Sequence, residues 1–385
     1  MMKVFRRYQE STSGNWLLLL ALLAFLVGCA QDEDADQQAA PKLDIYIYAP
    51  GKMTPTRSDD SQPMINPESG ESEVKKLQLW VYNSNNTSQL LGSFELGGTE
   101  LARLNSAGSE SYSMELPSSF AYGANPVVDV YVLANVTDNN CGAKKGTDSS
   151  LDELEDFKID KYYFSPTTGI PADGLPMSGV MRRQSLVQHN DVFHLNEANI
   201  KLERAVSKVR FVFSSLSASV DPNIKSIRIT KVTLDKDKLN QYEYLFLQNA
   251  PYRVGNTLNA EEITLLGEMG TIQTNEDPTV YAHKSKETAA EYEARINAAP
   301  DGALTKSSWL YLRESDQKLT GKIYYTIGGS TSAVASFSMA EGDFHRNQTW
   351  IVYAYYLGSS KLNVSTVQVT DWKNGGSDNQ GFHNW

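Results

Sequence analysis

The clearest structural signal in this chain is the stretch Ala205-Val206-Ser207-Lys208-Val209-Arg210-Phe211-Val212-Phe213. Large apolar side chains alternate here with charged ones, and successive side chains of a β-strand point to opposite faces. The alternation therefore predicts a strand that directs Val209, Phe211 and Phe213 inward to a core. We expect Lys208 and Arg210 on the opposite, outward face.

Many other segments on both sides of this stretch have the same strand character. Short runs rich in Val, Ile, Tyr and Phe recur along the chain, which is typical of β-sandwiches. Residues 150–160 and 287–299 predict short helices, and 175–179 predicts a turn. The other expected strands are 42–49, 74–82, 90–96, 111–116, 127–135, 191–204, 224–234, 242–248, 307–314, 319–327, 332–339 and 349–357.

The expected fold class is all-β, with two tandem β-sandwich domains and few short helices. A chain of 385 residues is long enough for two domains. We expect an N-terminal domain at 41–204 and a C-terminal domain at 205–385. The position of this boundary is open, because strand character is continuous from 191 to 213.

Composition excludes several classes of protein. The net charge of −11 argues against a nucleic-acid partner, which requires clustered Lys and Arg. The two cysteines cannot form a disulfide scaffold or a cysteine-rich zinc site. With 41% hydrophobic and 21% charged residues, the chain can bury a real core, so bulk disorder is not expected.

Residues 1–28 have the pattern of a targeting segment and are excluded from the fold. Lys3, Arg6 and Arg7 precede an apolar stretch at 16–27, which is shorter than the roughly 20 residues that span a bilayer. The sequence Leu26-Val27-Gly28-Cys29 that follows resembles a bacterial lipobox. This resemblance implies that Cys29 is lipidated and attaches the protein to the outer membrane. The alternative is a plain secretory signal with a chance cysteine.

Residues 29–40 predict a short acidic tether, because Asp and Glu are clustered there and apolar runs are absent. Acidic runs directly after a lipidated cysteine resemble the surface-export signals of Bacteroidetes lipoproteins. The alternative is a flexible spacer without a targeting role.

A search for reactive chemistry finds no catalytic, cofactor-binding or metal-binding motif. His189 and His194 invite a metal interpretation, but at this spacing near a strand start we expect them on opposite faces. The tyrosines at 324–325 and 353–356 could stack on sugars. Alternating aromatic residues on strands more often form core and cross-strand pairs. We therefore expect no enzyme activity, no cofactor and no metal.

Four segments, in this order and spacing, resemble the fimbrillin superfamily, the type V pilus subunits of Bacteroidales. The resemblance extends over most of the chain after the targeting segment. It implies two tandem transthyretin-like β-sandwich domains, export as a lipoprotein, and assembly with other fimbrial subunits by donor-strand exchange. The segments are Val130-Tyr131-Val132-Leu133-Ala134-Asn135, Leu175-Pro176-Met177-Ser178-Gly179, Leu202-Glu203-Arg204-Ala205-Val206-Ser207-Lys208-Val209, and Phe344-His345-Arg346-Asn347-Gln348-Thr349-Trp350 with Val369-Thr370-Asp371-Trp372.

Donor-strand exchange in this family implies a protease cut after an early strand, whose removal opens a groove for a neighbour's C-terminal strand. The early strand 42–49 is followed by 50–73, which is rich in Pro, Gly, Ser, Asp and Glu and predicts a long exposed loop. Arg57 lies in that loop and is the candidate cleavage site. The alternative is an ordinary loop arginine.

The C-terminal tail departs from the pattern that the family implies for a stalk subunit. Residues 373–385 are rich in Gly and Asn, which disfavour strands, so this tail would be a poor donor strand. A stalk, tip or anchor role therefore stays open. The main hypothesis is that this chain is a surface fimbrial subunit that supports adhesion. A host protein or glycan could be its receptor. The alternative is a surface-exposed glycan-binding lipoprotein, and an enzyme is disfavoured.

Overall fold

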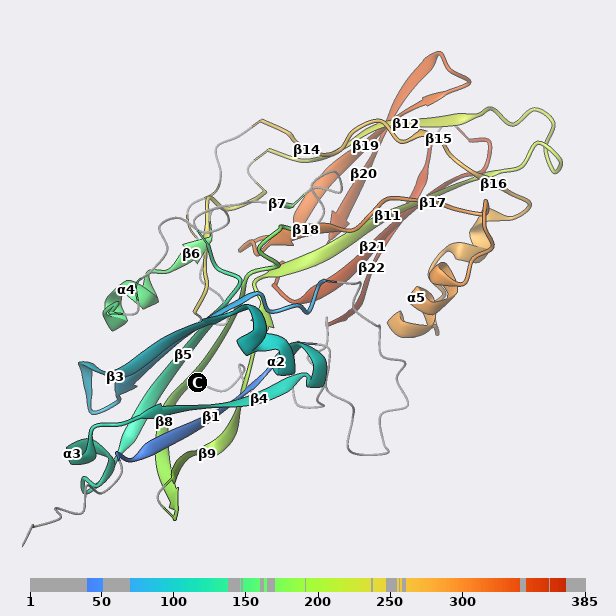
Figure 1. Ribbon diagram of the computed structural model, residues 1–385. Helices are drawn as coiled ribbons and strands as arrows, with labels where there is room; N and C mark the ends of the chain where they lie inside the picture. Colours follow the sequence, from blue (N-terminus) through green and yellow to red (C-terminus); the bar gives the residue numbers. More distant parts are fainter. Residues whose placement is uncertain are drawn as a thin grey trace, which may run out of the picture.

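The computed structural model of this chain is shown in Figure 1. Cys29, Arg57, residues 1–28, most of the acidic tether and the tail after Asp371 lie outside the residues that the structure describes. The described residues are 40–50, 70–137, 146, 148–159, 163–164, 170–190, 192–236, 238–246, 255, 257, 261–339, 344–359 and 361–371.

The N-terminal part of the chain forms an eight-stranded sheet in the described residues, with the order β3-β2-β5-β8-β9-β1-β4 and β10 paired with β8. A cluster of aliphatic side chains inside the curved sheet forms its core. The strands are β1 (Lys42–Tyr48), β2 (Lys76–Asn83), β3 (Asn86–Gly97), β4 (Ser109–Glu115), β5 (Val127–Ala134), β8 (Met177–His189), β9 (Val192–Lys201) and β10 (Glu203–Arg204).

The two ends of this sheet come close together, so that it almost closes on itself. The rings of Phe94 on β3 and Tyr112 on β4 have their centroids 6.0 Å apart. At Gly92 an added Cβ would meet the terminal methyl of Met114 at 2.0 Å, so the Met114 side chain of β4 lies directly against the backbone of β3. Side chains of β4 therefore pack against β3 without a backbone ladder.

The C-terminal part forms two further sheets that enclose a second core (Figure 1). The first has the order β22-β21-β11-β18-β7, and the second has the order β14-β12-β19-β20. Two more strands, β13 (Glu243–Tyr244) and β6 (Lys158–Ile159), pair with each other. The strands of the two sheets are β7 (Tyr163–Phe164), β11 (Val206–Leu216), β12 (Ile227–Leu234), β14 (Ile263–Leu266), β15 (Gly270–Thr271), β16 (Thr274–Asn275), β17 (Thr305–Lys306), β18 (Leu310–Arg313), β19 (Leu319–Ile327), β20 (Thr331–Met339), β21 (Gln348–Tyr356) and β22 (Asn363–Asp371).

Helices are few and short in the described residues. Helix α5 is the longest, and it begins with a capping box in which the Thr288 hydroxyl accepts from the Glu291 backbone N–H. A third apolar cluster joins α4 and α5 to the strands of both parts of the chain. None of the helices described is long and apolar enough to span a membrane. The helices are η1 (Gly98–Leu101), α2 (Ala102–Ala107), α3 (Ser118–Ala121), α4 (Leu151–Glu155), η2 (Pro278–Tyr281) and α5 (Ala289–Asn297).

The predicted all-β class with few short helices is confirmed, and so is the inward face of β11. Val209, Phe211 and Phe213 are each 0% exposed and belong to the C-terminal core. Lys208 does point to the opposite face of β11, but the prediction that it faces solvent is wrong, since it is 1% exposed. Arg210 is half-buried.

The turn predicted at 175–179 is also wrong in part, because Met177 is the first residue of the long strand β8. Arg182, Arg183 and Gln184 interrupt the apolar alternation there, which hides the strand in the sequence. Arg183 has a φ of 53°, at an irregularity in the pairing of β8 with β5. The irregularity breaks the period of two that strand prediction relies on.

Candidate functional site

Strand β1 lies inside the N-terminal sheet and has a backbone partner along each edge (Figure 1, blue strand between β4 and β9). It pairs antiparallel with β4 along all seven of its residues. It pairs parallel with β9, with a register shift between Asp44 and Tyr46. A sheet without β1 would therefore have two facing rows of unpaired backbone N–H and C=O groups.

One face of β1 is fully buried. Leu43, Ile45 and Ile47 are each 0% exposed, and Ala49, just after the strand, is 2% exposed. Burial of each such aliphatic side chain contributes about 1.5–3 kcal/mol. The predicted strand at 42–49, with these three side chains on one face, is confirmed with the bounds Lys42–Tyr48.

The opposite face of β1 is polar and aromatic. The carboxylate of Asp44 accepts a hydrogen bond from the hydroxyl of Ser113 on β4. Tyr46 is 39% exposed, which makes it one of the more exposed aromatic residues in the described part of the chain. Surface side chains of this kind would leave together with β1.

The predicted site residues Cys29 and Arg57 lie outside the described residues, so the geometry around them stays a prediction. Residues 51–69, which include Arg57, separate the described residues around β1 from those that begin at Gly70. The exposed-loop prediction for 50–73 is wrong at its end, because Glu71 and Ser72 are 0% and 3% exposed.

The four sequence segments that carry the family resemblance meet where the two parts of the chain join. Asn135, which ends the first segment, has a φ of 59°, a left-handed conformation that asparagine tolerates. Its Nδ2 donates to the carbonyl oxygens of Glu73 at 2.7 Å and Leu175 at 3.0 Å. Its Oδ1 accepts from the backbone N–H of Lys75 at 2.8 Å. One side chain thus joins residues 73–75 and Leu175 to the end of β5.

The third segment supplies two buried cations that meet Glu71. Lys208 Nζ lies 3.1 Å from Glu71 Oε2, and Tyr311 donates its hydroxyl to Glu71 Oε1 at 2.8 Å. Arg204 donates to the Glu71 carbonyl oxygen at 3.0 Å and to the Ser72 hydroxyl at 2.7 Å. Burial lowers the pKa of Arg204 to about 10 and also lowers the pKa of Lys208, while the Glu71 carboxylate opposes both shifts.

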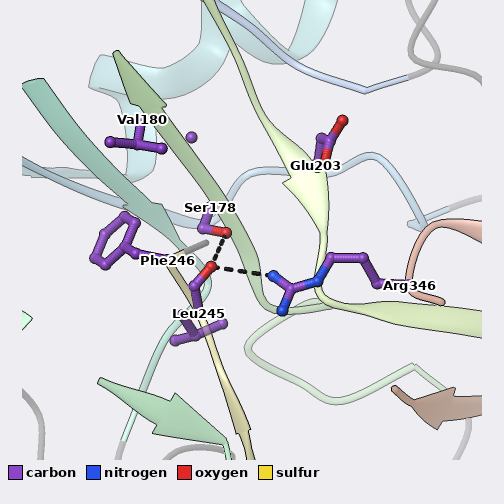
Figure 2. Close-up of a pocket in the computed structure, with 7 residues that line it drawn as sticks. Ser178, Val180, Glu203, Leu245, Phe246 and Arg346 are labelled. Atoms are coloured by element: carbon purple, nitrogen blue, oxygen red, sulfur yellow. Dashed lines mark hydrogen bonds between the residues drawn. The ribbon is translucent and has the colours of Figure 1, made fainter. Parts of the chain in front are cut away.

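The fourth segment supplies Arg346, shown in Figure 2 beside a cavity of about 10 Å³ that has room for roughly one water molecule. Its Nη1 donates to the Leu245 carbonyl oxygen at 3.0 Å, and Ser178 donates its hydroxyl to the same oxygen at 2.6 Å. Its Nη2 lies 2.8 Å from the Glu314 carboxylate. Burial alone would lower the pKa of Arg346, but Glu314 and Glu243 outweigh it and raise the pKa.

A second buried carboxylate lies next to this ion pair. Glu243 is 0% exposed, and its Oε2 accepts from the backbone N–H of Glu314 at 2.5 Å. Burial raises the pKa of Glu243 to about 8, with a further upward contribution from the Glu314 carboxylate and a downward one from Arg346. These buried charges connect the strands of both parts of the chain and are enclosed by protein, so their arrangement is that of a structural junction.

The two histidines considered as metal ligands lie close together in the structure. The prediction that His189 and His194 point to opposite faces is wrong, since their ring centroids are 5.6 Å apart. The register pairs Val187 with His194, which puts His189 two residues along on the same face. In the described part of the chain, no group of three or more His, Cys, Asp or Glu side chains could hold a metal ion.

Most of the tyrosines considered as sugar-stacking residues are core residues. Tyr325, Tyr353 and Tyr356 are 1%, 0% and 3% exposed. The hydroxyl of Tyr324 donates to the Glu262 carboxylate at 2.7 Å. The exposed aromatic residues are elsewhere, at Tyr46 and Tyr122.

Comparison with known proteins agrees with this geometry. Residues 49–210 match the family described as "Major fimbrial subunit protein (FimA)", and the match begins directly after β1. No curated protein matches this chain.

Solved structures are similar to this chain at low sequence identity. A protein assigned to cell adhesion from Parabacteroides distasonis is 15% identical and has a TM-score of 0.52, with 88% of this chain and 99% of that chain covered. A fimbrilin from Porphyromonas gingivalis is 10% identical with a TM-score of 0.49, covering 86% and 97% of the two chains.

The chain is therefore similar to fimbrial subunits over residues 49–210, and it has the all-β fold of the Parabacteroides distasonis protein. This sequence similarity to the fimbrial subunit family extends over less than half of the chain.

Proposed function

We propose that this chain is a non-enzymatic structural subunit of a cell-surface fimbria of type V, assembled by donor-strand exchange and supporting adhesion. The observation that carries this proposal is the position of β1, an inner strand with a fully buried aliphatic face and a ladder on each edge. Cleavage at Arg57 would remove the only covalent connection of β1 to the rest of the fold. A strand from a neighbouring subunit would then occupy the vacated position.

The energetics favour capture of a replacement strand. Loss of Leu43, Ile45 and Ile47 from the core would expose apolar surface worth on the order of 5 kcal/mol at about 1.5–3 kcal/mol for each side chain. That deficit is large against the about 5–15 kcal/mol by which a domain is typically stable. A donor strand restores the backbone ladders and fills the side-chain pockets at the same time.

We further propose that the mature protein begins at Cys29, is lipidated there, and is held at the surface of the outer membrane. The acidic tether 29–40 would separate the lipid from the folded part. The two domains would be 41–204 and 205–385, which agrees with the change of sheet between β10 and β11. Strands β6 and β7 cross this boundary, since they pair with β13 and β18.

The test is treatment of the purified protein with an arginine-specific protease, followed by mass spectrometry and native gel electrophoresis. We expect a cut after Arg57, release of the fragment that contains β1, and the appearance of oligomers with partner subunits. Arg57→Lys is the matched control, because it keeps the charge but is not a substrate for this protease. Resistance of Arg57, or cleavage that gives only monomers with partner subunits present, would show that strand exchange is wrong for this chain.

A glycan-binding surface lipoprotein is the second candidate function. The exposed rings of Tyr46 and Tyr122 favour it, since aromatic faces stack on sugars. Binding to a glycan panel that is lost in Tyr46→Ala and Tyr122→Ala would support this function, with the buried Tyr353 excluded as a contact.

A further inference from the structure

We propose that Glu71 and its buried partners hold residues 70–76 on the folded body, so that this segment stays in place when the strand upstream of it is released. This inference rests on the proposed function, in which β1 leaves after a cut upstream of residue 70. It adds a role for residues that the strand-exchange mechanism does not itself involve.

The side chain of Glu71 is held by charge as well as by burial. It is 0% exposed, and its two carboxylate oxygens accept from Lys208 Nζ at 3.1 Å and from the Tyr311 hydroxyl at 2.8 Å. Lys208 is itself 1% exposed and lies 4.6 Å from the centre of the Trp309 ring. Departure of Glu71 would leave the Lys208 ammonium buried without this carboxylate, which is strongly unfavourable.

The backbone after Glu71 is held by two asparagines from the N-terminal part of the chain. Asn105 Oδ1 accepts from the Val74 N–H at 2.8 Å, and its Nδ2 donates to the Val74 carbonyl oxygen at 2.7 Å. Asn135 binds the next residues in the same way, at the Glu73 carbonyl oxygen and the Lys75 N–H. Residues 71–75 are thus attached to both parts of the chain.

The upstream side is held differently, because its described contacts are those of β1 and the residue after it. After β1, the backbone N–H of Ala49 donates to the Gly108 carbonyl oxygen at 2.9 Å, which continues the ladder of β1 itself. In the described residues, β1 is retained by its ladders with β4 and β9, by its buried face, and by the Leu202 N–H, which donates to the Tyr48 carbonyl oxygen at 3.0 Å. The asymmetry predicts that a cut between 50 and 70 frees the upstream piece and leaves the downstream piece in place.

The rate of trypsin cleavage after Lys75 or Lys76 reports directly on this attachment. Lys76 is the first residue of β2, so cleavage after either lysine requires residues 70–76 to detach. In the wild-type protein we expect these bonds to resist trypsin, and the amides of Val74 and Lys75 to exchange slowly with deuterium. Glu71→Gln should raise the cleavage rate after Lys75 about tenfold or more, the effect expected from loss of one charge-assisted hydrogen bond.

Glu73→Gln is the comparison in the same segment, because its carboxylate is 49% exposed and lies 3.5 Å from Lys75 Nζ. Its effect on the cleavage rate after Lys75 should be smaller than that of Glu71→Gln, since an exposed ion pair contributes little. Tyr311→Phe removes a single hydrogen bond to Glu71, and it serves as the second variant if Glu71→Gln does not fold. It should raise the rate of cleavage after Lys75 by a smaller factor.

Wild-type protection at Val74 and Lys75 with faster cleavage in Glu71→Gln or Tyr311→Phe supports the inference. Rapid wild-type exchange at these amides, or variants that are cleaved after Lys75 as slowly as the wild type, overturns it. Neither readout depends on oligomer formation, so a failure of strand exchange is distinguishable from a failure of this inference.

Discussion

Lys208 on β11 and Glu71, just before β2, form an ion pair across the junction of the two parts of the chain, with 3.1 Å between Nζ and Oε2. The two side chains are 1% and 0% exposed. A buried pair of this kind stabilises little compared with well-packed apolar residues, but loss of one partner is costly. The pair therefore makes the junction sensitive to single substitutions.

Lys208→Met should destabilise the protein by about 3–5 kcal/mol, because the Glu71 carboxylate stays buried without its nearest cation. The free energy of unfolding from urea denaturation measures this. Arg210→Met is the control on the same face of β11, where the side chain is half-buried. It should lower the free energy of unfolding by less than Lys208→Met. Equal losses for the two variants would contradict the importance of the buried pair.

Phe211→Ala should cost about 3–5 kcal/mol, since the ring is fully buried and its removal leaves a cavity. The ring packs edge-on against Phe337 of the opposite sheet, with centroids 5.2 Å apart. Thermal or urea unfolding checks this value. Val334→Ala on β20 is the control, because Val334 is 48% exposed. If Phe211→Ala lowered the free energy of unfolding by less than this control, the result would contradict the observed packing.

Ile45→Ala should destabilise the intact protein by about 2–5 kcal/mol, because its side chain fills the core under β1. Tyr46→Ala, one residue away on the exposed face, should change stability far less. After cleavage, the Ile45→Ala fragment should dissociate faster than the wild-type fragment. Equal dissociation rates in size-exclusion chromatography would contradict the role of this face in retaining β1.

Glu243→Gln should reduce the dependence of stability on pH. The pKa of Glu243 is raised to about 8 in the folded state, so the folded protein retains a proton that the unfolded chain loses near pH 4.5. The contribution of Glu243 to stability is thus fully present below about pH 4.5 and is lost as the pH rises through about 8.

The free energy of unfolding should therefore fall more between pH 5 and pH 8 in the wild type than in Glu243→Gln. Glu268→Gln serves as the exposed control, with a side chain 50% exposed, and should keep the wild-type dependence. Identical pH profiles for wild type and Glu243→Gln would rule out the raised pKa.

Cys29→Ser should abolish labelling with palmitate and move the protein out of the membrane fraction. The expectation comes from Leu26-Val27-Gly28-Cys29 directly after the apolar stretch 16–27. Cys141→Ser is the matched control and should be labelled like the wild type. Unchanged labelling of Cys29→Ser would mean that the segment is a plain secretory signal.

Local periodicity in the sequence predicted much of the fold. The expected strands at 319–327, 332–339 and 349–357 correspond to β19, β20 and β21, and the side chains of β19 and β20 alternate between core and surface. The strand β22 was not predicted, because its run of Ser, Thr and Gln is weakly apolar. Strand β8 was missed for the same reason, with Arg182 and Arg183 in its middle.

The junction could not be predicted from the sequence. Lys208 looks like an exposed strand lysine, because nothing near it in sequence indicates that Glu71, 137 residues earlier, covers it. Glu71 in turn lies in a stretch whose composition predicts an exposed loop. The four resemblance segments were correctly singled out, but only the fold shows that Asn135, Arg204 and Arg346 lie at one junction.

The close approach of Met114 to Gly92 has a consequence for an acceptor groove. Among the described residues, β1 is the only strand that forms a ladder with β4. If β1 is released as we propose, β4 would lose its backbone pairing but would still have its side-chain contacts with β3 at Gly92 and Phe94. An incoming strand would then close the ladders with β4 and β9 in a single step. Capture should then be cooperative, with little affinity for a strand that reaches only one wall.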